Sequence, residues 1–385
     1  MFNLEKIPGI DALRTPCYVY DMGLLDSTIN ALRDSSVKYG INVNYALKAN
    51  SEPEILRKIA SYGFGADCVS GNEVSRAIEC GFPKSGVFYA GVGKTDREIV
   101  QALECGSPFF VVESLQELEV LSSIACSRAA EINVLLRINP EIDAHTHKFI
   151  TTGTSANKFG ISVNDLDAAL NLLGRLPGLR MQGLHSHIGS QITGMEFFSA
   201  QCERMNLFIE KVRSAGFECS MVSLGGGLGV DYDCPDTHPA PDFDGWFSAI
   251  DSSLNRTPGM KVFVEPGRSL VAQCGTLLSR VLFVKHNPAR NFLVLDAGMN
   301  NLMRPALYGA RHSIENLSAS GRGESGFEKY DVVGPVCESS DVFAGDCSLP
   351  VSLRGDIVAI RSAGAYGATM SSRYNLKDLA ETLYV

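Results

Sequence analysis

The sequence lacks several features that are typical of membrane-spanning, secreted and disulfide-rich proteins. No apolar run reaches about 18 residues, which argues against a membrane-spanning helix. The N-terminus lacks the basic start and apolar core of a signal peptide, so we expect a cytoplasmic protein. The 11 cysteines include no CxxC pair and are scattered, which is typical of reduced thiols rather than a disulfide framework. We expect no metal.

Positive charge is also scarce, and this bears on possible partners. The chain has 34 Lys and Arg residues against 43 Asp and Glu residues, giving a formal net charge of -9. Nucleic-acid binding needs clustered basic residues, so we expect no nucleic-acid partner and no membrane partner. A local basic pocket for a small anion remains compatible with this charge. The length of 385 residues suffices for one large barrel and a smaller domain.

Short apolar runs and amphipathic helix patterns alternate from about residue 41. Eight apolar runs are typical of buried strands, and a helix pattern follows each of the first seven. The expected strands span 41–49, 64–70, 86–91, 108–114, 131–139, 180–189, 219–227 and 261–268. This alternation predicts a (β/α)8 TIM barrel of the α/β class. A doubly wound open sheet gives a similar pattern and stays open as an alternative.

The pattern changes after about residue 275, where short strands follow one another without long helices. This predicts an antiparallel β-domain at the C-terminus. The segment TPCYVYD (15–21) is a further strand that precedes the barrel, and we expect it to join the β-domain. The expected domains are therefore a barrel over 22–275 and a β-domain made of 1–21 and 276–385.

Polar residues fall where the expected barrel strands end. They are Lys48, Asp67, Arg137, His187 with Ser190, the glycines 225–227, and Glu265 with Arg268. Active sites of barrel enzymes lie at the C-terminal ends of the strands, so we expect these groups to converge. A lone lysine at a strand end is more often structural, but six such groups at matching ends predict a site.

Two glycine-rich segments imitate nucleotide-binding motifs. AGVGKT (90–95) resembles a P-loop, but Phe88 stands where that motif needs a glycine. LGGGLGV (224–230) resembles a dinucleotide-binding turn, but the spacing from Gly225 fails at Val230. The second segment follows a late barrel strand, where backbone N–H groups commonly bind phosphate.

Six motifs together carry a resemblance to a known family. They are YALKAN (45–50), HIGSQ (187–191), GGGLG (225–229), EPGRSL (265–270), GPVCESSDVF (334–343) and AGAYG (363–367). In this order they resemble the alanine-racemase-like decarboxylases that use pyridoxal 5′-phosphate (PLP), most closely the diaminopimelate decarboxylases. The resemblance covers essentially the whole chain, and it implies a barrel followed by a β-domain.

The resemblance assigns residues to the cofactor. Lys48 would attach PLP covalently, in a neutral form that partial burial among other cations would favour. His187 would stack on the pyridine ring, and Glu265 would keep the pyridine nitrogen protonated. Ser190, Gly226, Gly227 and Tyr366 would bind the phosphate. The remaining members of the expected cofactor site are Asp67, Arg137, Pro266, Gly267 and Arg268.

The resemblance also assigns the catalytic acid and the assembly. Cys337 matches the residue that donates a proton after CO2 departs, and it joins Lys48 and His187 as an expected catalytic residue. In the family the loop that carries this cysteine comes from a second subunit. A homodimer with shared active sites is therefore expected.

A second set of residues implies the substrate. Arg268, Arg304, Tyr308, Glu338 and Tyr366 match positions that bind the far end of a diamino diacid. The implied reaction converts meso-diaminopimelate to L-lysine and CO2 in lysine biosynthesis. Decarboxylation of another diamino acid, such as carboxynorspermidine, and PLP-dependent racemisation remain alternatives. The chain departs from many family members because MSSRYN (370–375) is not followed by an Arg-Pro-Arg segment, which puts subunit contacts there in doubt.

Overall fold

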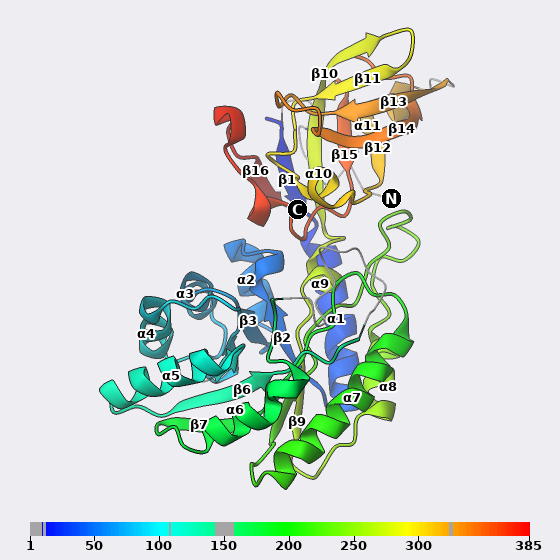
Figure 1. The fold of residues 1–385 in the computed structure, drawn as a ribbon. Coiled ribbons are helices and arrows are strands. Elements are labelled where there is room, and N and C mark those ends of the chain that lie inside the picture. The colour runs from blue at the N-terminus through cyan, green and yellow to red at the C-terminus, as the bar shows by residue number, and fades with distance from the viewer. Residues whose placement is uncertain (1–9, 11–12, 108, 143–157, 323–325) are drawn as a thin grey trace. The chain divides into compact units, whose positions relative to one another are not determined.

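A computed structural model describes residue 10 and residues 13–107, 109–142, 158–322 and 326–385 (Figure 1). Residue 108, where one expected strand begins, and residues 1–9, 11 and 12 of the expected β-domain lie outside this part. Backbone contacts divide the chain into two compact units. The barrel unit comprises Asn30–Gly229 and Asp242–Gly267, and the β unit comprises Met1–Ile29, Val230–Pro241 and Arg268–Val385.

Eight parallel strands close into a barrel in chain order. They are β2 (Asn42–Ala46), β3 (Gly65–Cys68), β4 (Val87–Tyr89), β5 (Phe109–Val112), β6 (Ile132–Arg137), β7 (Leu179–His185), β8 (Met221–Ser223) and β9 (Lys261–Val264). The barrel closes where β2 pairs with β9. This confirms the expected (β/α)8 barrel, because a doubly wound sheet would leave its two edge strands unpaired.

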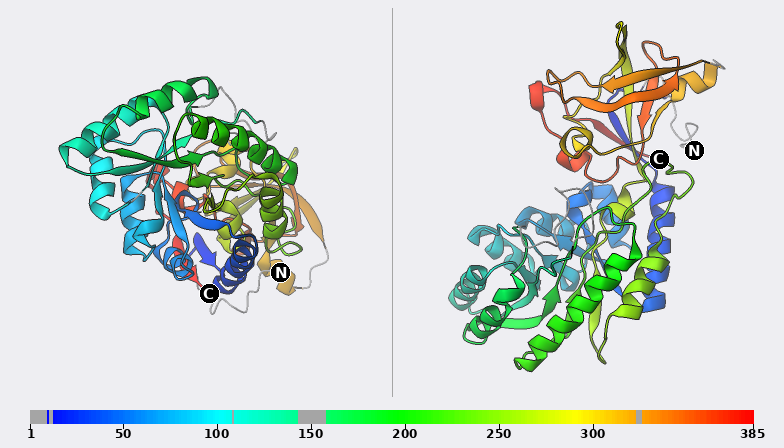
Figure 2. Two further views of the ribbon diagram at one scale, coloured as in Figure 1. Left: turned by 90° about the horizontal axis from the view of Figure 1, so that it is seen from below. Right: turned by 45° about the vertical axis from the view of Figure 1, so that its right-hand side comes forward.

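Helices surround the strands of the barrel, as the view from below in Figure 2 shows. They are α1 (Met22–Tyr39), α2 (Pro53–Ala60), α3 (Gly71–Glu79), α4 (Asp96–Cys105), α5 (Leu115–Ser127), α6 (Leu166–Leu173), α7 (Met195–Ser214) and α8 (Phe243–Ser253). The sequence sets several boundaries directly. Thr95 and Glu98 form a capping box at the start of α4, and Gly106 ends it in the left-handed conformation.

The interior of the barrel is a packed core rather than a channel. Phe88, Val111, Leu135 and Phe263 belong to one buried cluster contributed by β4, β5, β6 and β9. The rings of Phe88 and Phe263 lie 5.0 Å apart between centroids. Burial of these side chains stabilises the strands and fixes the positions of the residues at their carboxyl ends.

A mixed sheet forms the β unit. Its strands are β1 (Cys17–Tyr20), β10 (Gly275–His286), β11 (Asn291–Leu295), β12 (Ile314–Asn316), β13 (Phe327–Val333), β14 (Val342–Pro350), β15 (Ile357–Ile360) and β16 (Glu381–Tyr384). Strand β1 pairs antiparallel with β10, as expected for the N-terminal strand. Most pairs are antiparallel, whereas β11 with β13 and β1 with β16 are parallel. Short helices α9 (Arg268–Val271), α10 (Arg304–Tyr308) and α11 (Leu317–Arg322) complete the unit.

Residues 230–241 belong to the β unit although they lie between β8 and α8 in the sequence. Arg361 donates to Asp236 at 2.9 Å, and Gln273 donates to the carbonyl of His238 at 2.6 Å. These bonds connect the segment to residues more than 30 positions away. Chain order alone does not indicate this placement.

Candidate active site

Glu265 follows β9, and both of its carboxylate oxygens have partners at this end of the barrel. Its Oε1 accepts from the Ser223 hydroxyl at 2.6 Å, and its Oε2 lies 3.0 Å from His185 Nε2. Burial opposes ionisation of Glu265, but the interaction with His185 and the hydrogen bonds outweigh it and lower its pKa. The barrel therefore holds an ionised carboxylate that is 6% exposed.

The pKa of Asp67, in β3, shifts in the opposite direction to the pKa of Glu265. It is 3% exposed, and its Oδ1 has no hydrogen-bond partner among the described residues. Burial, followed by the charge of Glu265, raises the pKa of Asp67 to about 8, while Lys48 opposes the rise. One carboxylate of the pair is ionised and the other is protonated near neutral pH, because two buried like charges repel.

Lys48 lies in a short 3-10 helix, Leu47–Ala49, directly after β2. Its side chain is exposed, and its positive charge acts to lower the pKa values of Asp67, Glu73 and Glu265. The structure thus differs from the expected burial among cations. A lysine amine reacts only in its neutral form, so Lys48 needs a proton acceptor before it can react.

The glycine-rich turn after β8 has a backbone conformation and close contacts that residues with a side chain do not tolerate. Gly225 and Gly227 have positive φ angles of 64° and 123°. A Cβ on Gly226 would lie 2.2 Å from the carbonyl oxygen of Glu265. The N–H groups of Gly226 and Gly227 have no acceptor within the described part of the chain. Such a backbone cradle fits a phosphate group.

His187 lies beside this cradle, since its Nδ1 would be 2.7 Å from a Cβ on Gly225. Burial, with the charges of Lys48 and Arg137 in addition, holds the pKa of His187 well below its ordinary value. The ring is therefore neutral at physiological pH. A neutral imidazole is suited to stacking on an aromatic ring.

Arg137 is the last residue of β6 and forms an ion pair with Glu113, a carboxylate that was not predicted from the sequence. Its Nη1 lies 2.7 Å from Glu113 Oε1. Glu113 also accepts from the N–H groups of Gly91 and Gly160. The arginine is thus part of a buried ion pair that joins β5 and β6 to their loops.

Lys94, in the segment that resembles a P-loop, is also bonded to a carboxylate and to backbone carbonyls. It bonds to Glu117 at 2.6 Å and to the carbonyls of Gly91 and Val111. Its side chain is 1% exposed. These contacts make Lys94 a structural residue and agree with setting the P-loop aside.

Two buried arginines meet around one tyrosine in the β unit. Arg268 begins α9 and donates to the Tyr232 hydroxyl at 2.6 Å. Arg304 begins α10, and its Cζ lies 4.7 Å from the centroid of the Tyr232 ring. Arg268 also lies 4.9 Å from the ring of Tyr366. Arg304 is 5% exposed, lies 2.9 Å from His312 Nε2, and has no carboxylate partner among the described residues.

Cys337 and Glu338 lie in the loop between β13 and β14. The Cys337 N–H donates to Asn375 Oδ1 at 2.9 Å, and the Tyr374 hydroxyl donates to Glu338 at 2.6 Å. Asp341 stabilises the same loop by accepting from the N–H groups of Met299 and Val336. Cys337 and Glu338 are exposed on the single chain.

Comparison with known proteins identifies the family. Residues 25–272 match the model of the pyridoxal-dependent decarboxylase, pyridoxal binding domain. The chain is 45% identical to diaminopimelate decarboxylase of Bacteroides thetaiotaomicron, over 98% of this chain and 97% of that protein. The chain belongs to the diaminopimelate decarboxylase family. As a member of these PLP-dependent decarboxylases, it is a lyase whose cofactor is pyridoxal 5′-phosphate.

Solved structures of other decarboxylases share the whole fold. Diaminopimelate decarboxylase of Helicobacter pylori complexed with L-lysine matches with a TM-score of 0.90 and 35% identity, covering 100% of this chain and 94% of that chain. A lysine/ornithine decarboxylase of Vibrio vulnificus complexed with cadaverine matches with a TM-score of 0.84 at 24% identity, covering 100% of both chains. The second likeness shows the fold alone.

Several residues of the candidate site were not predicted from the sequence. Glu113, His185 and Ser223 each lie at a strand end, so the strand-end rule could have found them. Tyr232 follows the GGGLG motif by three residues, but nothing local marks it as a partner of arginine. His312 has no signal in the sequence, because its two bonding partners are a side chain and a distant carbonyl.

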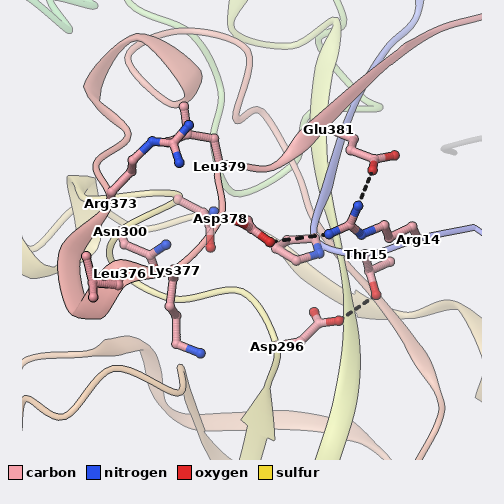
Figure 3. Close-up of a pocket in the computed structure, with 12 residues that line it drawn as sticks. Arg14, Thr15, Asp296, Asn300, Arg373, Leu376, Lys377, Asp378, Leu379 and Glu381 are labelled. Atoms are coloured by element: carbon pink, nitrogen blue, oxygen red, sulfur yellow. Dashed lines mark hydrogen bonds and ion pairs between the residues drawn. The ribbon is translucent and has the colours of Figure 1, made fainter.

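A separate pocket of 580 Å³ lies in the β unit of this decarboxylase (Figure 3). Arg14 bonds there to Asp378 and Glu381, and Thr15 donates to Asp296. None of the residues that line it is an expected site residue.

The described residues contain no cluster of metal-ligand type and no helix long and apolar enough to cross a membrane.

Proposed function

We propose that the protein removes CO2 from meso-diaminopimelate and releases L-lysine, a reaction of lysine biosynthesis. The observation that carries the choice of substrate is the buried guanidinium of Arg304, which lacks a carboxylate partner within the described residues and faces Arg268. Burying two like charges is unfavourable unless an anion joins them. A second carboxylate on the substrate supplies this anion. Lysine or ornithine, bound as a substrate, would place its side-chain ammonium beside the two arginines, which would repel it.

The residues at the barrel end fit PLP. When bound, PLP withdraws electrons from the α-carbon and so allows the bond to the carboxylate to break. Lys48 would attach the cofactor, and the N–H groups of Gly226 and Gly227 with Ser190 and Tyr366 would bind its phosphate. Ionised Glu265 would keep the ring nitrogen protonated, and Pro266, Gly267 and Arg268 follow it in the same motif. His187 would stack on the ring.

Proton movement at Lys48 follows from its neighbours. Its ammonium must lose a proton before the amine can react, and Asp67 has a pKa of about 8 in this structure. Asp67 is mostly protonated at neutral pH, and its ionised form, which becomes more abundant as the pH approaches 8, can accept the proton of Lys48. We assign this role to Asp67, and we assign Arg137 the support of the adjacent loop through Glu113.

The β13–β14 loop would supply the remaining groups. Cys337 would donate the proton that replaces the departing carboxylate, and Glu338 would bind the distal ammonium. Arg268, Arg304 and Tyr308 would bind the distal carboxylate. The exposure of Cys337 and Glu338 on one chain supports a homodimer in which each loop serves the partner's site. We also propose a cytoplasmic location, in keeping with 11 unpaired cysteines.

The test is a CO2-release assay on the PLP-loaded protein with four compounds. These are meso-diaminopimelate, L-lysine, L-ornithine and carboxynorspermidine. We expect turnover of the first and little turnover of the others, since they lack a second carboxylate. Equal or faster release of CO2 from any of the other three would overturn the substrate. Exchange of the α-hydrogen without release of CO2 would instead show a racemase.

A further inference from the structure

Among the described residues, Arg304 of the β unit contacts the imidazole of His312 and the ring of Tyr232 and has no carboxylate partner. Arg304 and Arg268 are 5% and 6% exposed. Burial, with the charge of Arg268 in addition, lowers the pKa of Arg304, whereas Tyr232 and Tyr366 outweigh the burial of Arg268 and raise its pKa. The Nε of Arg304 has no hydrogen-bond partner among the described residues. A buried N–H donor without an acceptor is energetically unfavourable. The pair is therefore kept in place at a free-energy cost, and particular residues must hold it there.

Tyr232 contacts both arginines. Its hydroxyl accepts from Arg268 Nη1 at 2.6 Å. Its ring faces the Arg304 guanidinium, with 4.7 Å between Cζ and the ring centroid. A hydrogen bond and a cation–π contact from one rigid side chain fix the separation of the two cations.

His312 fixes the orientation of Arg304. Its Nε2 lies 2.9 Å from Arg304 Nη1 and must accept, because a guanidinium only donates. Its Nδ1 then donates to the carbonyl of Arg361 at 2.9 Å. Burial, together with the charge of Arg304, lowers the pKa of His312 to about 3, so the ring is neutral and adds no third charge. Its edge packs against Tyr232 at 5.2 Å.

The Arg361 carbonyl, which accepts the hydrogen bond from His312, belongs to a residue whose side chain is held by two ion pairs. The Arg361 guanidinium donates to Glu315 at 2.8 Å and to Asp236 at 2.9 Å. Asp236 and Tyr232 both belong to the segment 230–241, which the fold places in the β unit. The support of the arginine pair thus continues from Arg304 through His312 to Arg361, a buried arginine bonded to two carboxylates.

We propose that Tyr232 and His312 are positioning residues that hold Arg268 and Arg304 ready for a carboxylate and thereby make a second carboxylate on the substrate a requirement. The inference rests on the proposed function, because it concerns the far end of that substrate. Neither residue is assigned a contact with the cofactor. An arginine pair held in its binding geometry loses little conformational freedom when the carboxylate arrives. Without Tyr232 and His312, the two arginines would move apart, and the site would lose its preference for a substrate with a second carboxylate.

The first test compares two substitutions at one position in the PLP-loaded enzyme. His312→Leu removes the acceptor for Arg304, whereas His312→Gln keeps an acceptor that can reach it. We expect His312→Leu to raise KM for meso-diaminopimelate about tenfold or more while kcat changes less, since a hydrogen bond to a charged group is lost. His312→Gln should recover most of the loss. Tyr232→Phe keeps the ring but removes the acceptor for Arg268, and should also act mainly on KM.

The second test measures binding without turnover. L-lysine keeps the distal carboxylate of the proposed substrate, whereas cadaverine differs from it only by lacking a carboxylate. Calorimetric titration of the PLP-loaded enzyme should show tighter binding of L-lysine. His312→Leu and Tyr232→Phe should each weaken L-lysine about tenfold and leave cadaverine unchanged. The matched controls are His286→Leu and Tyr62→Phe, which lie outside the cluster and should preserve the preference.

The outcomes separate the inference from the proposed function. If the wild type fails to release CO2 from meso-diaminopimelate, the proposed function is wrong. If the wild type is active but the variants keep the full preference for L-lysine, or lose both ligands equally, only the positioning role is wrong. If His312→Leu does not fold, as judged by circular dichroism and PLP absorbance, Tyr232→Phe and His312→Gln decide the question by the same titration.

Discussion

Asp67 and Glu265 illustrate how two carboxyl groups in one barrel acquire opposite protonation. Glu265 receives hydrogen bonds from Ser223 and contacts His185, while Asp67 has an oxygen without a partner among the described residues. Hydrogen bonding to the ionised form lowers a pKa, and burial near a like charge raises it. The charge therefore concentrates on Glu265, the group assigned to the cofactor nitrogen.

The raised pKa of Asp67 predicts a pH-dependent stability of the protein without cofactor. The folded pKa of about 8 exceeds the ordinary value of 3.8. Between these values the unfolded chain binds fewer protons, so Asp67 should lower the free energy of unfolding by up to about 1.4 kcal/mol per pH unit as pH rises. Asp67→Asn should remove this slope, as measured by urea unfolding from pH 5 to 9. Exposed Asp34→Asn is the control, and parallel curves for wild type and Asp67→Asn would refute the assignment.

Lys48 and Lys94 make contrasting predictions for cofactor attachment. Lys48 is exposed at the end of β2, whereas Lys94 is buried against Glu117. Borohydride reduction of the PLP-loaded protein, followed by peptide mapping, should find the pyridoxyl group on Lys48. Lys48→Ala should abolish the cofactor absorbance. A pyridoxyl group on Lys94 or Lys158 would contradict the proposal.

At the scale of elements, the loop with Cys337 depends on a turn from the C-terminal region. Asn375 accepts from the Cys337 N–H and has a left-handed backbone with φ of 54°. Asparagine tolerates that conformation better than most residues do. The turn and the Tyr374–Glu338 bond therefore position both groups that the loop supplies.

Cys337→Ala should reduce kcat by about 10²–10⁴-fold, the contribution of a positioned general acid, while PLP absorbance persists. Near-normal turnover would show that another group donates the proton.

Asn375→Ala should also lower kcat, because the Cys337 N–H loses its acceptor, but it should add little in a Cys337→Ala background. Asn375→Asp keeps an acceptor and serves as the control. Additive effects of the two substitutions would show that Asn375 acts independently of Cys337.

At the scale of the whole molecule, the proposed shared site can be tested by mixing inactive variants. Lys48→Ala and Cys337→Ala lie in the barrel unit and the β unit respectively. If each site combines Lys48 of one subunit with Cys337 of the other, hybrid dimers contain one complete site. Equal mixing after subunit exchange should then restore about a quarter of wild-type activity. No recovery in dimers shown to have exchanged would place both residues in the same subunit's site.

The sequence by itself determined the barrel, the N-terminal strand's place in the β sheet and most residues at the strand ends. Hydrophobic periodicity and glycine positions are local properties, and a barrel places every parallel strand end at the same face. The six motifs supplied the family and its expected cofactor residues.

Only the tertiary structure decided which of these groups are already paired. Glu113 with Arg137, His185 with Glu265 and His312 with Arg304 depend on distances across strands and loops, which no local pattern records. The parallel pairing of β16 with β1 and the transfer of residues 230–241 to the β unit have the same origin. Each is fixed by the packing of segments far apart in the chain, because burial and hydrogen-bond geometry are satisfied by the whole fold rather than by its parts.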